Sequence, residues 1–346
     1  MEAVEARPVR PAAAPRALVL LGSLGLTVGA VVVALNVFTG ESASGTCVAT
    51  LDDGTRAALD ADQADNAALM AAIAVRRELP ARGVTVAVAT ALQESKLRNI
   101  DYGDRDSVGL FQQRPSQGWG TVEQIMDPVY STNAFYDVLV TVESWESKAV
   151  TEAAQDVQRS AFPDAYARHE GRGRAFASAL TGHSPATLVC HLDDVPEDDG
   201  ATAGTAAGTT TEDGPTAGGT TAAAPALAGT EPAPTAPQRL AAVRDRLGRD
   251  FGAIDVEVAP GGVLVVDAAS LPPGLDAAPT RRAWAVAQWA VATASTTDAR
   301  VVATDGRAWV RADGDGAAWT PVAEADVPSA VVDAMTQSGP GSVVIG

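Results

Sequence analysis

The 346-residue sequence is poor in side chains that commonly bind metals, with two cysteines, three histidines and no His-Glu-x-x-His spacing. We therefore expect neither a metal nor an organic cofactor. Basic residues are also few, because 25 lysines and arginines stand against 43 acidic residues and leave a net charge of −18. This charge argues against nucleic acid and anionic membrane surfaces as main partners. Aromatic residues make up only 5% of the chain, so part of it is not expected to pack into a core.

The longest apolar run, residues 17–38, has 22 residues and no charge. A helix of that length spans a bilayer, and the three preceding arginines predict a cytoplasmic N-terminus with the rest of the chain outside the membrane. The alternative is a secreted protein whose signal is cleaved near residues 42–44. Both interpretations export the remainder of the chain.

The two cysteines, Cys47 and Cys190, are expected to form a disulfide, as cysteine pairs of exported proteins usually do. The bond would close a loop of more than a hundred residues. In the chain-entropy model such a loop contributes about 4–5 kcal/mol to stability.

A carboxylate, Glu94, stands near the end of an apolar stretch, Ala-Leu-Gln-Glu-Ser-Lys-Leu at residues 91–97. The sequence Ser-Val-Gly-Leu-Phe-Gln-Gln follows at 107–113, so Gly109 lies 15 residues after Glu94. An acid that cleaves a glycosidic bond must stay protonated near neutral pH, which requires a raised pKa and usually apolar burial. The apolar neighbours of Glu94 suit this role. The alternative is a surface side chain paired with Arg98, four residues on.

This pairing resembles the catalytic motif of lytic transglycosylases and goose-type lysozymes, where a Glu-Ser step opens the motif and a Gly-Leu-Met-Gln step closes it. The resemblance covers about residues 61–169. It implies a lysozyme-like domain that cleaves the β-1,4 bond between N-acetylmuramic acid and N-acetylglucosamine in peptidoglycan strands, with Glu94 as the acid/base. It also implies a substrate site formed by Ser107, Gly109, Gln112, Gln113, Asn133, Gln158 and Tyr166.

Two chemical outcomes are compatible with this motif. Lytic transglycosylases use one glutamate and form a 1,6-anhydro product, which is the outcome we favour. A hydrolytic muramidase needs a second carboxylate, about 6.5–9.5 Å away for inversion and about 5 Å away for a covalent route. Candidates for that second carboxylate are Asp101, Asp104 and Asp106.

Composition completes the predicted architecture, which is multidomain: a single transmembrane helix, an all-α lysozyme-like domain, a disordered linker and a small α+β C-terminal domain. The predicted segments are a cytoplasmic tail (1–16), a membrane anchor (17–38), a tether (39–60), the lysozyme-like domain (61–192), a Thr/Ala/Gly/Pro-rich linker (193–237) and the α+β domain (238–346). An envelope protein is a possible partner of the last domain. The rival function is a non-catalytic module that grips glycan or scaffolds the envelope.

Overall fold

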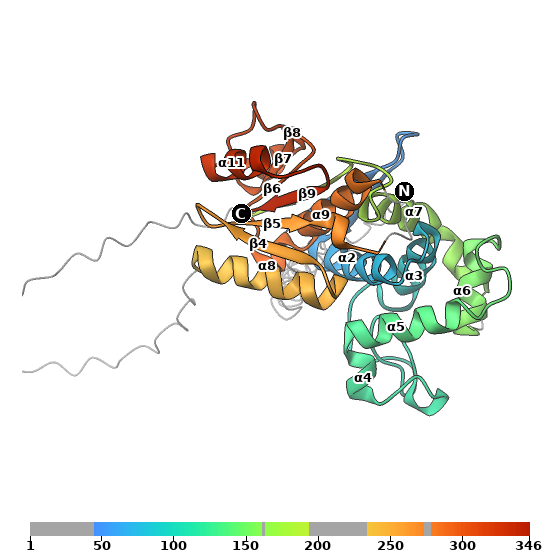
Figure 1. The fold of residues 1–346 in the computed structure, drawn as a ribbon. Coiled ribbons are helices and arrows are strands. Elements are labelled where there is room, and N and C mark those ends of the chain that lie inside the picture. The colour runs from blue at the N-terminus through green and yellow to red at the C-terminus, as the bar shows by residue number, and fades with distance from the viewer. Residues whose placement is uncertain (1–44, 161–162, 194–233, 273–277) are drawn as a thin grey trace, which may run out of the picture. The chain divides into compact units, whose positions relative to one another are not determined.

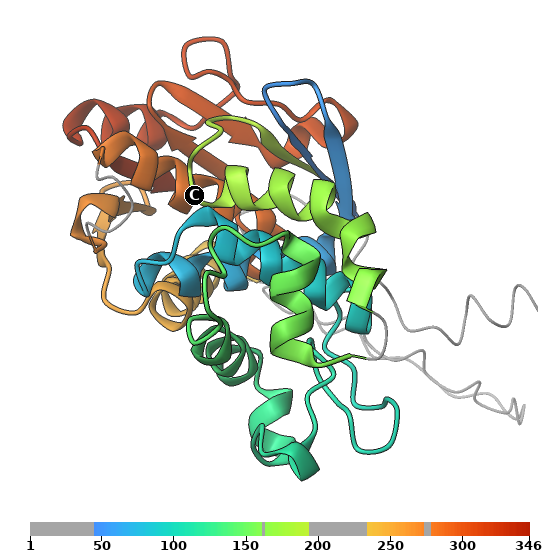
Figure 2. The same ribbon diagram turned by 90° about the vertical axis from the view of Figure 1, so that its right-hand side faces the viewer.

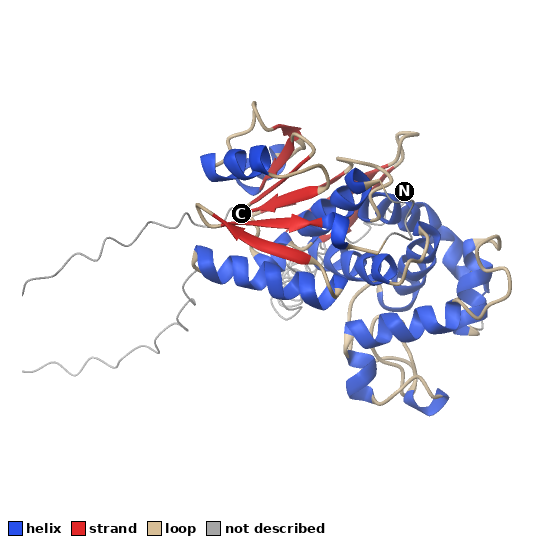
Figure 3. Ribbon diagram, in the orientation of Figure 1, coloured by secondary structure: helices blue, strands red, loops and turns tan. Residues whose placement is uncertain are grey.

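A computed structural model describes residues 45–160, 163–193, 234–272 and 278–346 (Figure 1). The described residues belong to one compact unit. Its described part combines helices with two antiparallel sheets in a mixed α+β fold (Figure 3). The prediction of an all-α domain over 61–192 is therefore wrong, because this segment ends in a strand of the smaller sheet.

The helical part is built around α2 and α3, which pack against each other and against α7. In the first turn of α2, the Gln63 side chain caps the helix start by accepting a hydrogen bond from the Asp60 N–H over 2.9 Å. Where α3 and α7 cross, a Cβ at Gly173 would lie 2.8 Å from the Thr85 carbonyl oxygen, so the close crossing requires glycine. The elements are α2 (Ala61–Arg76), α3 (Ala81–Ser95), η1 (Pro115–Gln117), α4 (Val122–Met126), α5 (Pro128–Leu139), α6 (Val150–Gln158), η2 (Pro163–His169) and α7 (Glu170–Leu180).

The smaller sheet has three strands in the order β2-β1-β3: β1 (Gly45–Thr50), β2 (Arg56–Asp60) and β3 (Leu188–Leu192). Alternate residues of each strand face the core. Strands β1 and β2 lie in the segment expected to be a tether. Strand β1 is rich in small residues, so its sequence shows no strong apolar–polar alternation. Its partner β3 is distant in sequence, so no local turn predicts that the two strands pair.

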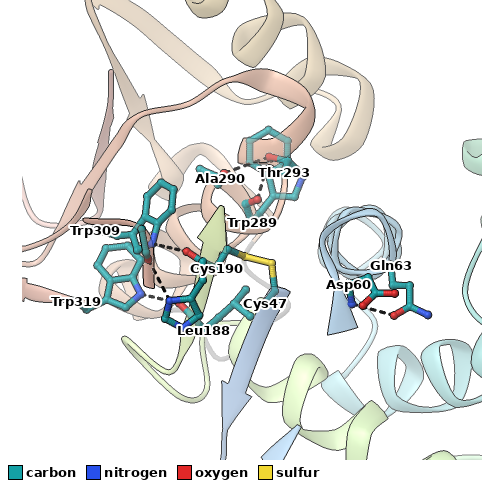
Figure 4. The surroundings of a disulfide bond; sticks show 12 residues. Cys47, Asp60, Gln63, Leu188, Cys190, Trp289, Ala290, Thr293, Trp309 and Trp319 are labelled. Carbon is teal, nitrogen blue, oxygen red and sulfur yellow. Dashed lines mark hydrogen bonds between the residues drawn. A yellow bond between two sulfur atoms is a disulfide. The ribbon is translucent and has the colours of Figure 1, made fainter. Parts of the chain in front are cut away.

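The disulfide prediction is confirmed, since Cys47 and Cys190 are bonded and lie directly opposite each other in the β1–β3 ladder. Figure 4 shows that two tryptophans from the C-terminal part close over this point. The Trp309 indole donates to the Cys190 carbonyl over 3.2 Å, and the Trp319 indole donates to the Leu188 carbonyl over 2.8 Å. Strand β3 is thereby held both by a covalent bond and by residues more than a hundred positions later.

The larger sheet, in the C-terminal part, has the strand order β4-β5-β9-β6-β7-β8. Two hairpins stand in it: β4 pairs with β5 across the Pro-Gly-Gly turn, and β6 pairs with β7 across Asp305-Gly306. The elements are α8 (Ala236–Phe251), β4 (Asp255–Ala259), β5 (Val263–Asp267), η3 (Ala268–Ser270), α9 (Pro279–Ala292), α10 (Ala294–Thr297), β6 (Val301–Thr304), β7 (Arg307–Val310), η4 (Arg311–Gly316), β8 (Thr320–Pro321), α11 (Ser329–Gln337) and β9 (Ser342–Ile345).

Helix α9 joins the two parts, because it packs on β6 and β9 of the larger sheet and also on α2, α7 and β3 (Figure 1). Its residues from Arg282 to Ala292 are all buried. The Gln288 side chain inside this helix accepts hydrogen bonds from the N–H groups of Thr187 and Leu188 and donates to the carbonyls of Ala179 and Ser184. One hydrophobic core therefore runs through both parts.

The single-pass membrane architecture needs correction. No helix among residues 45–160, 163–193, 234–272 and 278–346 has the length and apolar character to cross a bilayer, a finding against the predicted fold class and membrane localisation. The apolar run at 17–38 lies outside the described residues, as does 194–233, most of the predicted linker.

Candidate active site

Glu94 and Ser95 occupy the last turn of α3, which ends where Lys96 and Leu97 adopt left-handed backbone angles with φ of 57° and 60°. The Leu97 N–H bonds the Ala91 carbonyl over 2.8 Å, and the Leu97 side chain is buried. The start of α2 supports this end, since the Gln63 side chain donates to the Lys96 carbonyl over 2.7 Å. The position of Glu94 is therefore set by a rigid helix end.

Arg98 does not pair with Glu94, which removes the surface ion pair considered as the alternative role. Its guanidinium donates instead to Asp62 over 2.7 Å and to Asp60 over 2.5 Å. The Glu94 side chain is half-buried. It remains available for another contact.

That contact comes from Tyr166 in η2, whose hydroxyl donates to Glu94 Oε1 over 2.7 Å. Tyr166 is fully buried. Burial, followed by the neighbouring Glu94 carboxylate, raises the pKa of Tyr166, so the phenol stays protonated and remains a donor. Tyrosine holds one carboxylate oxygen of Glu94, and the two residues meet although 72 positions separate them.

The Gly-Leu-Phe-Gln turn is fastened beside the end of α3. Ser95 Oγ donates to the Leu110 carbonyl over 2.7 Å, and Gln158 Nε2, at the end of α6, donates to the Phe111 carbonyl over 2.8 Å. A bridge between Val108 and Gln113 closes the turn. Ser95 and Gln158 thus fix the loop next to Glu94, and sequence reasoning gave Ser95 no such role.

Gly109 is required by packing rather than by an approaching ligand. Its φ is 79°, and a Cβ at this position would lie 2.8 Å from the Ile125 carbonyl oxygen. Its N–H donates to the Ile100 carbonyl over 2.7 Å. Glycine is needed here because the turn lies against α4.

The other predicted amides of the loop are used inside the protein. Gln112 Nε2 donates to the Tyr102 carbonyl over 3.2 Å and to the Gly109 carbonyl over 3.4 Å. Gln113 is buried and its Nε2 donates to the Ser131 carbonyl over 3.1 Å. Both side chains brace the loop and the start of α5.

Asn133 and Ser107 are likewise committed elsewhere. Asn133 Nδ2 donates to the Val129 carbonyl over 2.8 Å, and its Oδ1 accepts from Arg77, just past the end of α2, over 3.1 Å. Ser107 is buried, and its N–H donates to the Asp104 carbonyl over 3.1 Å. Of the predicted substrate residues, the structure brings Tyr166 to Glu94 and Gln158 to the adjacent turn.

The acidic loop does not present a second carboxylate in contact with Glu94 within the described chain. Asp106 accepts from the Ser116 N–H and from Arg114 Nε, each over 2.8 Å. These bonds, the Ser116 backbone first, hold the pKa of Asp106 well below its usual range. Asp101 and Asp104 are exposed.

A polar cluster adjoins Glu94 that the sequence did not predict. Arg168 donates to Gln93 Oε1 over 2.7 Å and to His169 Nε2 over 3.2 Å. Burial, followed by Arg168 and Arg172, lowers the pKa of His169, which keeps its ring neutral. The cluster fixes η2, and therefore Tyr166, against the last turn of α3.

No group of three or more histidine, cysteine or acidic residues in the described segments is arranged to hold a metal ion. The scan against protein-family models returned no match to this chain. The search of curated proteins also found no similar protein.

Proposed function

We propose that this protein cleaves the peptidoglycan glycan strand at the β-1,4 bond between N-acetylmuramic acid and N-acetylglucosamine, with Glu94 as the single acid/base. The observation that carries the proposal is the hydrogen bond from the buried Tyr166 hydroxyl to Glu94 Oε1. It orients a half-buried carboxyl on a rigid helix end beside a fastened Gly-containing turn. General acid–base catalysis requires such positioning before any other property.

In the proposed mechanism, Glu94 first donates its proton to the bridging oxygen, and the bond from that oxygen to C1 of the muramyl sugar breaks. The Glu94 carboxylate then takes the proton of the muramyl 6-hydroxyl as that oxygen bonds to C1. The product is a 1,6-anhydro sugar, no water is consumed, and Glu94 is again protonated. Because Tyr166 binds Oε1, we assign the proton transfers to Oε2.

The hydrogen bonding of Asp106 favours this route over hydrolysis. An inverting hydrolase needs a base that positions water, and a retaining one needs a nucleophile. Asp106 is held by Arg114 and Ser116 instead. A tyrosine, not an aspartate, contacts Glu94.

The deciding experiment is mass analysis of the soluble sugars that the full chain releases from purified peptidoglycan. We expect 1,6-anhydromuramyl ends, lost in Glu94→Gln and retained in the matched control Glu146→Gln, which alters an exposed glutamate. Reducing ends would assign a hydrolytic muramidase. Absence of product from a folded, glycan-binding wild type would assign the non-catalytic role.

A protein partner for the C-terminal part stays a prediction. Because α9 contributes to the common core, deleting residues 238–346 would disturb the helical part as well. Point substitutions at exposed apolar residues of the C-terminal part, Val258 and Val332, are the suitable test, with binding to envelope proteins as the measurement.

A further inference from the structure

A pocket of about 360 Å³ lies at the opposite end of α3 from Glu94. Its walls come from the first turn of α3, from α7, from the residue after β1 and from the loop after α7; Figure 2 shows the β1–β2 hairpin (dark blue) against α7 (yellow-green). A helix rises about 1.5 Å per residue, so Arg82 and Glu94 are roughly 18 Å apart along the axis. The pocket is separate from the candidate active site.

The lining of this pocket is basic although the chain as a whole is acidic. Arg82, Arg174 and His183 line it, and no acidic residue does. Arg174 is exposed and forms no ion pair with any residue in the described part of the chain. Asp53 is one acid that lies within electrostatic range of Arg174, and its carboxylate already accepts from the Thr55 N–H over 2.8 Å. The charged side chains that line the pocket itself are the two arginines.

Several hydrogen-bond donors are grouped in the pocket wall. Arg82 donates one guanidinium N–H to the Lys148 carbonyl, while its Nε is buried without a hydrogen-bond partner among the described residues. A buried donor of a charged group is costly when unsatisfied. Ser178 lines the pocket, and its Oγ shares a hydrogen bond of 2.7 Å with Ser184 Oγ behind the lining, in which either hydroxyl can be the donor.

His183 adds a defined polar edge. Arg281 of α9 contacts His183 Nε2. A guanidinium can only donate, so Nε2 accepts and the ring proton lies on Nδ1. His183 therefore connects the pocket to the C-terminal part through Arg281.

We propose that this pocket binds a phosphate group. Two guanidinium groups match the oxygens of a phosphate and form charge-assisted hydrogen bonds, with hydroxyl donors to take the remaining oxygens. The N-terminal end of the 15-residue helix α3, which has no acidic residue in its first turn, adds favourable partial positive charge. The proposal does not rest on glycan cleavage.

The test is titration of the full chain with inorganic phosphate, with sodium chloride holding the ionic strength constant and calorimetry or phosphorus NMR as the readout. We expect saturable binding by the wild type and weakening of about tenfold or more in Arg174→Gln, which removes one charge-assisted contact. The matched control is Arg172→Gln, an exposed arginine on the same helix outside the pocket lining. Its affinity should stay within about twofold of wild type, since distant exposed charges are screened.

Three results would overturn the proposal. One is the absence of saturable binding by the wild type. A second is equal loss in Arg172→Gln and Arg174→Gln, which would indicate general charge attraction. The third is acetate binding as tight as phosphate binding, which would exclude a phosphate site. Thermal unfolding of each variant verifies that the exposed substitutions leave the fold intact.

Discussion

Replacing Tyr166 by phenylalanine removes one hydroxyl from the candidate active site and keeps the ring. The ring is fully buried, so phenylalanine preserves core packing while Glu94 loses its 2.7 Å hydrogen bond. Hydrogen bonds to charged groups contribute about 1.5–3 kcal/mol. If that contribution is lost in the transition state, turnover falls by about 10-fold to 150-fold.

The assay for Tyr166→Phe is turnover of soluble glycan strands of defined length, with anhydro ends counted by mass spectrometry. The loss should fall mainly on kcat, because the hydroxyl orients the acid rather than the substrate. Tyr102→Phe is the control, since Tyr102 is 69% exposed in the loop and its hydroxyl is remote from any core packing.

Activity of Tyr166→Phe within about twofold of wild type would refute the reasoning, because a transition-state hydrogen bond of this type is worth more than that. A parallel loss of thermal stability and activity would instead indicate a packing role. A variant with unchanged melting temperature and reduced kcat supports the assignment of Tyr166 as a positioning residue.

Three further predictions follow from buried polar contacts. Gln158→Leu should lower activity and cost about 1–2 kcal/mol of unfolding free energy, because the Phe111 carbonyl loses its 2.8 Å donor; activity assays and urea unfolding measure both. Gln288→Leu should cost about 2–5 kcal/mol in urea unfolding, because the Thr187 and Leu188 N–H groups lose their acceptor while the Ala179 and Ser184 carbonyls keep other donors. Stability should decline as the pH rises above about 10, because unfolded tyrosine ionises there while burial raises the pKa of Tyr136 and Tyr166; melting temperatures against pH measure the decline.

Matched controls separate these effects from general damage. Gln337→Leu alters an exposed glutamine at the end of α11 and should change the unfolding free energy by less than about 0.5 kcal/mol. A Gln288→Leu loss no larger than this would contradict the role of that side chain in joining the two parts. Constant stability between pH 9 and about 11 would contradict the alkaline prediction.

Local sequence signals predicted the elements whose causes are local. Pro128 after Asp127 marks the start of α5, and its Asp127 cap bonds the Val129 N–H over 2.8 Å. The Asp305-Gly306 turn places β6 beside β7. The β1–β3 pair was not predicted, because its strands are far apart in sequence and the small residues of β1 show little apolar alternation.

The sequence singles out Glu94 as the candidate acid but does not predict the contacts around it. The motif identifies Glu94, but its hydrogen-bond partner depends on how η2 crosses α3. Tyr166 was expected to bind glycan and instead contacts Glu94 directly. Gln112 was expected to face sugar, and its half-buried amide donates to carbonyl groups of its own loop. Such contacts depend on tertiary packing that no motif encodes.

The disulfide between Cys47 and Cys190 makes residues 47–190 a covalent ring. A single protease cut in an exposed loop of that ring, such as residues 101–105, would release no fragment until a reductant is added. Under non-reducing conditions, nicked and intact chains would therefore have nearly the same mass and migrate alike. Glu94 and Tyr166 both lie inside the ring, so after one broken peptide bond between them they are still covalently connected through the disulfide.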